Sequence, residues 1–405
     1  MDKNTILAFI LIAVIIIIYP YFMPKQEVIK KSNPANPATV VEEKKAEAKQ
    51  VEDSLLSDNK TEFVPATEQN SVYAPEEKDI KIETDIYRAV ISTRDGIIKS
   101  WKVKQYKSRI DTSKIVELIK ENTKNLESEI RLMNGMVIKN VVFEADTDYI
   151  KISGNGKTAE LVLSYKGADG QVQFTKNYRF YSDKYSFDLS IDTTPIFSDL
   201  STESAVGINW RDGIKFSEVS DNGKNLNRED YYRATYVKSS DKLTEYDNND
   251  DPEKTTGEIN WGATRSKYFE VFLASTTEKL SSFENSPAHG KTEDHYTSMG
   301  FSVNFNKNTD PVKNLLVYFG PMDYETFKTY DKEFGLTMNW GWDIIKPFSL
   351  GIYWTLKYLH KFIDNYGLVI IILSLLVNTL VLPFTLKSYK SQAEMKKIQP
   401  EIKVL

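Results

Sequence analysis

The pattern of hydrophobic and polar positions places apolar segments near both ends of the chain, with a long alternating region between them. Residues 5–23 carry no charged side chain, and about 19 apolar residues suffice to cross roughly 30 Å of hydrocarbon as a helix. A cleaved signal peptide would have a shorter apolar core and a small-residue cleavage site, whereas Pro20 and aromatic residues follow here. The pattern predicts an uncleaved anchor over residues 1–23.

Residues 24–76 have the composition of a solvated linker. Prolines are scattered among Lys, Glu, Asn and Ala, and such a segment cannot bury enough apolar surface to offset its chain entropy. The Glu, Lys and Ala run over residues 41–51 has helix-forming composition, but a flexible tether is the expected state of the whole segment.

Residues 77–335 show the alternation of β-strands. Helical periodicity is nearly absent before residues 323–332, so we expect a large β-sandwich of two antiparallel sheets. Residues 110–126 are a candidate for a short helix inserted between strands. The runs expected to form strands are residues 86–92, followed by a turn at Asp95 and Gly96, residues 159–165, followed by Lys166 and Gly167, and residues 172–180, 271–275 and 315–319.

Candidate chemistry in the β-region is sparse. The acidic stretch 247–253 lacks the glycine and the terminal glutamate of an EF-hand loop, so a solvated turn is expected. His289 and His295 lie in a Gly/Ser/Pro-bearing loop at a spacing that matches no helical zinc motif. We therefore expect neither a metal site nor a cofactor. Three tryptophans are expected in the core rather than in a ligand cleft: Trp101, Trp210 and Trp261.

Residues 336–364 predict an amphipathic helix that lies in the membrane interface. Polar or small residues recur every three or four positions, and Pro347 is tolerable in the first turn. Tryptophans favour the interface, and a membrane span follows directly. A core helix docked on the β-region is the alternative interpretation. The residues expected to bind the interface are Phe348, Ile352, Trp354, Leu356 and Leu359.

Residues 365–386 predict a transmembrane helix, because the segment from Tyr366 to Leu386 carries no charge and has the length of a span. A basic flank follows in residues 387–405, as the positive-inside rule requires of a cytoplasmic segment. Two spans place both ends of the chain on the same side, so we expect both termini in the cytoplasm. The flank is formed by Lys387, Lys390, Lys396 and Lys397.

Composition and the absence of known motifs argue against several classes of function. The 52 Lys and Arg residues against 57 Asp and Glu give a net charge of −5, which provides no global field to attract nucleic acid. The absence of cysteine excludes disulfides, thiol catalysis and thiolate metal sites. No nucleophile elbow, Walker loop or dinucleotide fingerprint is present, so an enzyme is not expected.

Several local motifs resemble those of the YidC/Oxa family of membrane protein insertases, in its Gram-negative form. SKYFEVFLA, with Tyr268 and Phe269, is similar to a strand of the family. YFGPMDYETFKTY is similar to the motif that closes the family's periplasmic domain. Gly341-Trp342, Tyr366-Gly367, Pro383 and the terminal IQPEI resemble the start of its conserved core. The order of anchor, linker, β-domain, interfacial helix and span also matches, over essentially every residue.

The resemblance implies a periplasmic β-supersandwich together with membrane helices: the N-terminal anchor, the interfacial helix and the first core transmembrane helix. It implies a bacterial inner-membrane, multi-pass protein whose hydrophilic groove receives polar parts of nascent membrane proteins without covalent chemistry. A cytoplasmic helical hairpin would begin in residues 387–405. The lipid bilayer, the Sec translocon and the ribosome are the implied partners, with no other nucleic-acid binding.

The groove of this family usually carries an arginine five positions before the core proline, and this chain has Asn378 there. Asparagine donates hydrogen bonds but cannot hold a positive charge. Ser374 stands where many relatives have a threonine, and a spacing of four places it on the same helix face as Asn378. Both are groove candidates by resemblance, and helix–helix hydrogen bonding is the open alternative.

The sequence stops at Leu405, inside the first arm of the family's cytoplasmic hairpin, so it does not contain most of the core helices. Such a chain is not expected to close the groove by itself. The alternative function is a membrane-tethered β-sandwich that binds a ligand or acts as a periplasmic scaffold. A cleft of clustered aromatic rings would favour that alternative.

Overall fold

A computed structural model describes residues 75–108, 111–217, 234–240, 242–247, 252–286, 299–330, 332–342 and 344–402. The predicted anchor over residues 1–23, nearly all of the linker, His289, His295 and most of the acidic stretch 247–253 lie outside the described residues.

The described strands form a small and a large sheet. The small sheet has five strands in the order β4-β3-β2-β1-β8, and its β1–β8 pair is parallel. Its strands are β1 (Asp79–Glu83), β2 (Tyr87–Ser92), β3 (Ile98–Lys107), β4 (Ile115–Glu117) and β8 (Tyr149–Lys151).

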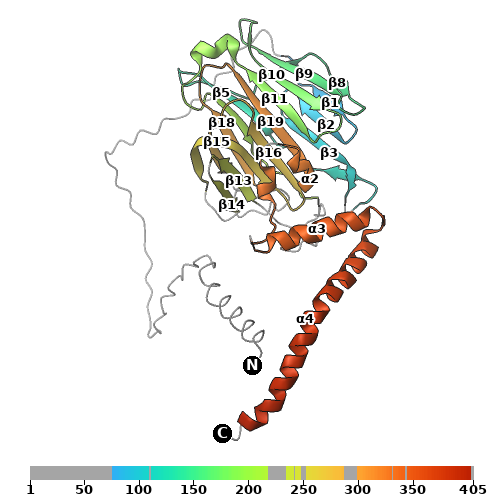
Figure 1. Cartoon of the computed structure of the whole chain (residues 1–405). Coiled ribbons are helices and arrows are strands. Elements are labelled where there is room, and N and C mark those ends of the chain that lie inside the picture. Colours follow the sequence, from blue (N-terminus) through green and yellow to red (C-terminus); the bar gives the residue numbers. More distant parts are fainter. Residues whose placement is uncertain are drawn as a thin grey trace, which may run out of the picture. The chain divides into compact units, whose positions relative to one another are not determined.

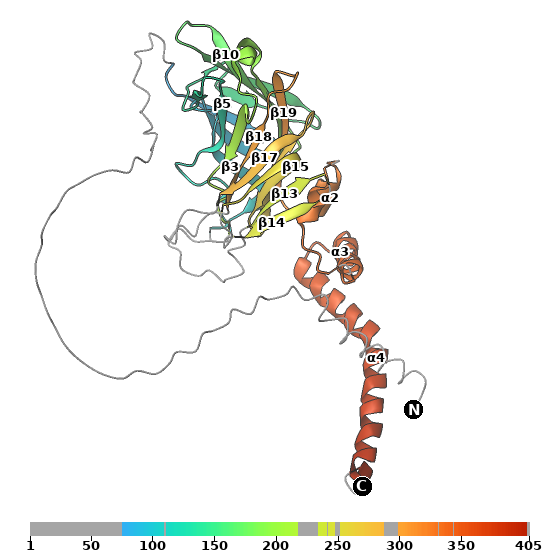
Figure 2. The ribbon, with the colours of Figure 1, turned by 90° about the vertical axis from the view of Figure 1, so that its left-hand side faces the viewer.

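The large sheet has 14 strands among the described residues, twelve of them in the order β6-β5-β12-β18-β17-β15-β16-β19-β11-β10-β9-β7. The β13–β14 hairpin joins this sheet through β15, as Figure 2 shows. The strands are β5 (Asn125–Arg131), β6 (Val137–Ile138), β7 (Glu144–Ala145), β9 (Thr158–Lys166), β10 (Val172–Tyr181), β11 (Ser186–Asp192), β12 (Val206–Trp210), β13 (Ala234–Ser239), β14 (Leu243–Asp247), β15 (Lys254–Arg265), β16 (Phe269–Ser275), β17 (Leu280–Ser286), β18 (Gly300–Phe305) and β19 (Val312–Pro321), with a 3₁₀ turn η1 at Thr194–Asp199.

The two sheets share one hydrophobic core, which confirms the predicted sandwich (Figure 1). Alternation along the strands turns apolar residues inward, as in β1, where Ile80 and Ile82 are buried while Asp79 and Lys81 are exposed. The three tryptophans that the sequence placed in the core are fully buried there. Trp101 stacks on Tyr87 with ring centroids 4.2 Å apart, so these aromatic rings fill the interior and do not line a cleft.

The predicted turn at Asp95 and Gly96 connects β2 to β3. Both residues have positive φ, 55° and 63°, which is the backbone of the tight turn that Asp-Gly favours between antiparallel strands. A Cβ on Gly96 would lie 2.7 Å from the hydroxyl oxygen of Tyr178, so the turn requires glycine for space as well as for conformation. The strand runs predicted from residues 86–92, 159–165, 172–180, 271–275 and 315–319 are all confirmed.

The helix expected over residues 110–126 is wrong for the described residues 111–126, which form β4, turns and the first residues of β5. Within β4 the buried Val116 lies between the half-buried Ile115 and Glu117, as the two-residue period of a strand requires. Asn122 has a φ of 62°, which lies in the left-handed region that asparagine tolerates and which a continuous right-handed helix excludes. The strand pairing of β4 with β3 decided the local structure.

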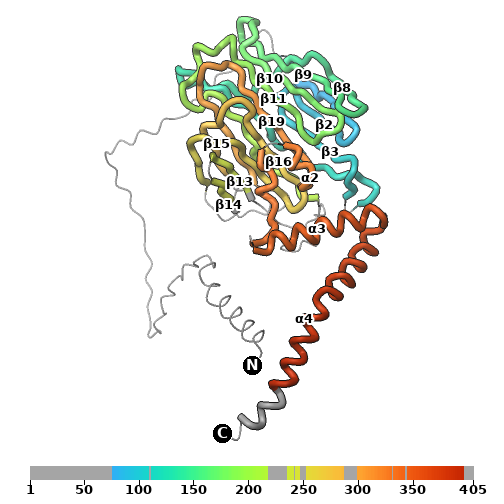
Figure 3. Tube along the Cα trace, viewed as in Figure 1, coloured from blue at the N-terminus to red at the C-terminus, as the bar shows by residue number. Residues whose placement is uncertain are grey.

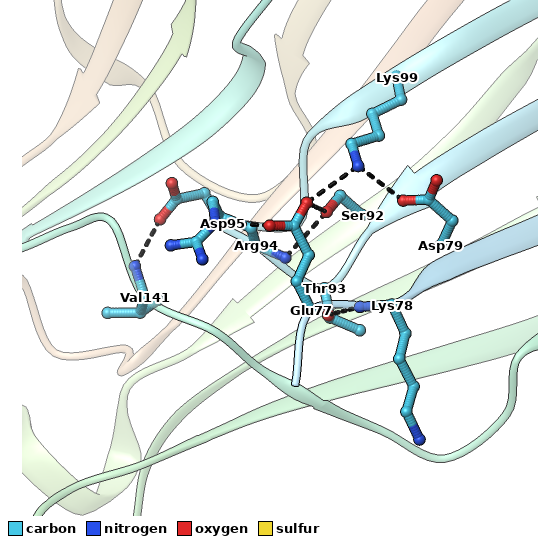
Figure 4. Close-up of polar contacts among 9 residues, drawn as sticks. All are labelled: Glu77, Lys78, Asp79, Ser92, Thr93, Arg94, Asp95, Lys99 and Val141. Carbon is cyan, nitrogen blue, oxygen red and sulfur yellow. Dashed lines mark hydrogen bonds and ion pairs between the residues drawn. The ribbon is translucent and has the colours of Figure 1, made fainter. Parts of the chain in front are cut away.

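A polar cluster fastens the first described residues to β2 and β3 (Figure 4). The Glu77 carboxylate accepts hydrogen bonds from Arg94 Nε at 2.7 Å and from Lys99 Nζ at 2.9 Å. Ser92 Oγ donates a third at 2.9 Å, and Lys99 also reaches Asp79 at 2.8 Å. The hydrogen bonds from Arg94, Lys99 and Ser92 lower the pKa of Glu77 to about 2.

Among the described residues, the α-helices follow the last strand, β19. Helix α2 (Tyr324–Lys328) is capped by Asp323, whose carboxylate accepts from the Thr326 backbone N–H at 2.9 Å. The 3₁₀ turn η3 (Phe334–Thr337), α3 (Lys346–His360) and α4 (Tyr366–Ile402) follow, and Figure 3 traces the chain through them. Pro347 lies in the first turn of α3, as predicted. The predicted span over residues 365–386 and the first residues of the basic flank belong to one continuous helix, α4.

Candidate functional site

Helix α4 contains the candidate groove residues. Among the described residues, one helix is long and apolar enough to cross a membrane, and it spans Tyr366–Met395. Ser374 and Asn378 are both exposed on it. Their spacing of four places them on one face, because each residue advances by about 100° around a helix of 3.6 residues per turn.

The same face carries further polar residues that the sequence interpretation did not single out. Thr385 follows Asn378 by seven residues, and Ser388 and Gln392 continue the row with a contact of 3.4 Å between Gln392 Nε2 and Ser388 Oγ. We call the set of Ser374, Asn378, Thr385, Ser388 and Gln392 the polar stripe. Leu376 lies on the opposite face and is 45% exposed. A helical wheel drawn over residues 374–392 would have shown this stripe. Such a prediction needed only the assumption that the helix continues past Leu386.

Residue Asn365 starts α4. Its side-chain Oδ1 accepts from the Gly367 backbone N–H at 2.9 Å, and its carbonyl oxygen accepts the first helical hydrogen bond from Val369 N at 3.1 Å. The rings of His360 and Tyr366 stack at 3.8 Å across the turn that joins α3 to α4. The basic flank lies on α4, with Lys387 and Lys390 exposed; Lys396 and Lys397 belong to the helix, but their side chains are not among those described.

Helix α3 exposes a broad apolar surface. Phe348 is 72% exposed and Ile352 is 45% exposed, while Leu356 and Leu359 on the same face are half-buried. Ile344, Tyr358 and Phe362 extend the exposed apolar surface on one side of this face. Such an exposed surface on a short helix is unfavourable in water and is typical of a contact with lipid or another protein.

The opposite side of α3 contacts α2. The Lys357 ammonium lies 3.6 Å from Glu325, and the rings of Tyr324 and Tyr353 meet edge to face at 5.7 Å. Trp354 belongs to this side, because the ammonium groups of Lys328 and Lys357 lie 5.1 Å and 5.4 Å from its ring centroid. Trp354 is 45% exposed, as Ile352 is, so its prediction as an interface residue stays a prediction.

The β-sandwich itself offers little that resembles a catalytic centre. Among the described residues, no group of three or more His, Asp and Glu side chains is placed to hold a metal ion. One open depression on the large sheet has a volume of about 500 Å³ and is lined by polar residues that include Asn177, Arg179, Asp188 and Asn314. Its aromatic residue, Tyr178, is 1% exposed, so this depression lacks the cluster of aromatic rings that would favour a ligand-binding module.

Several charged side chains are buried in the sandwich, and sequence reasoning did not find them; two of these, Lys176 and Glu270, have strongly shifted pKa values. Lys176 is fully buried on β10, and desolvation lowers its pKa to about 7 against the attraction of Asp95 and Glu127. Glu270 is fully buried on β16, and desolvation raises its pKa to about 8 despite the nearby Arg265. Lys176 is in phase with the buried Phe174, Tyr178 and Phe180, so the alternation of β10 indicates its inward position. Glu270 lies in a strand whose residues are all buried, so alternation gives no such signal there.

Comparison with known proteins gives matches along the described domain and helices. The family model described as the YidC periplasmic domain matches residues 79–350, and the model described as the 60Kd inner membrane protein matches residues 358–405. The "Membrane protein insertase YidC" of Geobacter sp. (strain M21) is 28% identical over 334 residues, which are 80% of this chain and 59% of that protein. The protein of the same name from Maridesulfovibrio salexigens is 26% identical over 98% of this chain and 71% of its own length.

A solved structure, the crystal structure of YidC from Thermotoga maritima, covers 82% of this chain and 75% of its own at 14% identity and a TM-score of 0.33, which is too low to support an argument. The chain thus spans between about three fifths and three quarters of the YidC relatives that it matches. The periplasmic-domain model alone matches more than half of the chain, and the inner-membrane model follows it in order. The chain therefore belongs to the YidC family.

Proposed function

We propose that this chain serves as the N-terminal part of a membrane protein insertase, which lowers the barrier for polar segments of nascent membrane proteins to enter the bilayer. The observation that carries this proposal is the part of the polar stripe that lies within the predicted span of α4: Ser374, Asn378 and Thr385. Polar side chains on a membrane-spanning helix are costly unless they meet other polar groups, so they mark a functional or packing surface. A substrate segment that pairs with them loses less hydration free energy than one that enters hydrocarbon directly.

The remaining parts of the described chain support this arrangement. The apolar face of α3 around Phe348 and Ile352 suits a helix that lies in the membrane interface, and α2 contacts its other side. In this proposal α4 spans the inner membrane with its basic flank in the cytoplasm, and the β-sandwich lies in the periplasm. The anchor over residues 1–23 supplies the second span, so that both ends of the chain are cytoplasmic.

The mechanism that we propose needs no cofactor and no covalent step. Asn378 and Ser374 offer hydrogen bonds to a passing polar segment, and Asn378 does so without the positive charge that many relatives place there. Nascent membrane proteins are the substrates, and the ribosome and the Sec translocon deliver them in this scheme. A tethered β-sandwich that binds a ligand is the less supported function, because the tryptophans that were candidates for a cleft are buried.

The double variant Ser374→Leu/Asn378→Leu tests the proposal in the full-length protein in its native membrane. The assay measures insertion of a test protein that has a polar translocated tail and a single span. We expect a several-fold loss of insertion, because the tail then meets an apolar face. The matched control is Thr379→Leu, which makes the same polar-to-apolar change about 120° away from the stripe and removes only a hydrogen bond to the Leu375 carbonyl at 2.8 Å.

Unchanged insertion by the double variant would remove the stripe from the mechanism. An equal loss in the Thr379→Leu control would mean that the substitutions act by changing helix packing, and this outcome would also contradict the proposal. A test protein with an apolar tail, measured in parallel, should insert equally well in all three forms, since it gains nothing from polar groups.

A further inference from the structure

Two exposed tyrosines lie at the end of the β-sandwich that carries α2. Tyr268 is in the turn between β15 and β16 and is 51% exposed, and Tyr106 is near the end of β3 and is 39% exposed. Phe269, which follows Tyr268 in the chain, meets the Tyr106 ring edge to face, with the ring centroids 5.6 Å apart. Strands of the small and the large sheet thus contribute to one aromatic surface.

A series of contacts links this surface to the start of α4. The Met322 N–H donates to the Tyr268 carbonyl oxygen at 2.8 Å, and Asp323, the next residue, caps α2. Burial raises the pKa of Tyr106, and Asp323 and Tyr366 raise it further, so both lie within electrostatic range of its hydroxyl. Tyr366 is the first residue of α4. The aromatic surface of the sandwich therefore lies near the point where α4 begins.

The start of α4 fixes the level of the membrane surface. The uncharged residues 366–386 measure about 31 Å as a helix, which matches a hydrocarbon core of about 30 Å. Asp364 precedes this segment and Lys387 follows it, so it cannot shift far along the membrane normal. Tyr366 therefore lies at the hydrocarbon boundary on the side of the sandwich. The headgroup layer extends about 5–8 Å beyond that boundary. Side chains of the sandwich close to Tyr366 are then at the level of the headgroups.

The chemistry of the surface suits phospholipid headgroups. Tyrosine combines an apolar ring with a polar hydroxyl, and it is enriched at the boundary between hydrocarbon and water. The Lys267 ammonium lies 5.5 Å from the centroid of the Tyr268 ring and adds a positive charge that attracts lipid phosphates. The neighbouring carboxylates are engaged within the chain, because Asp323 caps α2 and Glu325 pairs with Lys357 at 3.6 Å. Their repulsion of phosphate groups is reduced accordingly.

We propose that Tyr106, Lys267 and Tyr268 form a seat by which the β-sandwich rests on the phospholipid headgroups around the start of α4. The apolar face of α3 enters the interface, and the seat contacts the same layer from the sandwich. The two contacts together restrict the orientation of the sandwich relative to the membrane. This inference rests on the proposed span of α4 and is independent of the polar stripe and of the insertase activity.

Quenching of a site-specific fluorophore by nitroxide-labelled lipids tests the seat. Tyr149, on β8, provides a matched control because it is 52% exposed. Through β1 and β2, Tyr149 is in register with Ser100 of β3, which is about 20 Å along the strand from Tyr106. The chain contains no cysteine, so a single introduced cysteine carries the fluorophore without background. The variants are Tyr106→Cys and Tyr268→Cys in the seat, Tyr149→Cys as the control, and Ile371→Cys within α4.

Each labelled full chain is purified and reconstituted alone in phospholipid bilayers that carry the nitroxide either on the headgroup or on the acyl chain. We expect the headgroup nitroxide to quench the labels at positions 106 and 268 about twofold or more beyond the label at position 149, because only the seat reaches the headgroup layer. The acyl-chain nitroxide should quench the label at position 371 most strongly. Either seat position suffices if the other variant does not fold.

The outcomes separate the seat from the proposed span. Equal headgroup quenching at positions 106, 268 and 149, with strong acyl-chain quenching at position 371, would overturn the seat and leave the span intact. Weak acyl-chain quenching at position 371 would refute both. Since no other protein is present, a surface that binds a partner protein in place of lipid gives no excess quenching at position 268, and that result also overturns the proposal.

A charge reversal tests the contribution of Lys267. Lys267→Glu in the chain labelled at position 106 should lower the quenching by the headgroup nitroxide, because a carboxylate repels lipid phosphates. The matched control is Lys151→Glu, which reverses the charge of an exposed lysine on β8 and should leave the quenching unchanged. Equal quenching in the two variants would contradict a seat that contains Lys267.

Discussion

Substitution of Lys176 by methionine should remove a specific pH dependence from the stability of the sandwich. The ammonium group of Lys176 is fully buried and donates to the backbone carbonyl oxygens of Asp95 and Leu126, both at 2.9 Å. Desolvation is the largest influence on it, and its pKa falls from 10.5 to about 7. The folded chain therefore releases this proton far more easily than the unfolded chain does.

The sign of the effect follows from proton binding. Between pH 7 and 10.5 the unfolded chain binds more protons at Lys176 than the folded chain, so this residue makes the protein more stable as pH rises. One proton contributes at most about 1.4 kcal/mol per pH unit. Because the folded chain still binds part of this proton near pH 7, the slope is smaller there, and the gain in stability between pH 7 and 9 is about 2 kcal/mol. In Lys176→Met this contribution is absent.

The assay is urea unfolding of the full chain in detergent, followed by the fluorescence of the buried tryptophans, at pH 7, 8 and 9. The free energy of unfolding of the native chain, minus that of Lys176→Met, should rise by about 2 kcal/mol from pH 7 to pH 9. Other titrating groups, including Glu270, cancel in this difference. Parallel pH curves for the two proteins would refute the reasoning, because Lys176 would then titrate as it does in the unfolded chain.

Two further predictions concern the β2–β3 region. Gly96→Ala should destabilise the sandwich by about 1–3 kcal/mol in the same unfolding assay, because a positive φ and the Tyr178 hydroxyl both oppose a Cβ, and an unchanged midpoint would show that the turn relaxes freely. The depressed pKa of Glu77 means that its stabilising contacts are fully present above pH 4.5 and are lost as pH falls toward 2. After correction for the intrinsic exchange rate, the protection of β1 amides should therefore fall as pH drops from 4.5 toward 2 in the native chain but not in Glu77→Gln, and identical profiles would contradict the role given to the cluster.

The sequence was sufficient for the parts of the fold that depend on local periodicity. Alternation located the main strands, and the Asp95-Gly96 pair identified a tight turn because few residues accept two consecutive positive φ angles. The same logic failed at residues 110–126, where pairing with β3 imposed a strand on a segment of mixed pattern. Strand order and the parallel β1–β8 pair depend on contacts between distant residues, which no local window contains.

In the candidate site, too, local spacing could be predicted from the sequence and long-range packing could not. Helical spacing placed Ser374 and Asn378 on one face, and the continuous helix α4 extends that face to Thr385 and beyond. Trp354 was predicted as an interface residue, and its contacts with Lys328 and Lys357 could not be predicted because they depend on how α2 packs against α3. The buried charges of Lys176 and Glu270 were not foreseen. The alternation of β10 indicates the position of Lys176, whereas the burial of Glu270 depends on how the two sheets and η3 pack around it.

The central claim is that the polar stripe of α4 meets substrate during membrane insertion, and site-specific photo-crosslinking tests it most directly. A photoreactive residue is placed at position 378 of the full-length protein in its native membrane, and at position 376 on the opposite face as the matched control. A ribosome-bound membrane protein with a polar translocated segment is then supplied. The account predicts a crosslink to the nascent chain from position 378 that far exceeds the crosslink from position 376. Equal crosslinking from both faces, or none from position 378 while insertion proceeds, would contradict it.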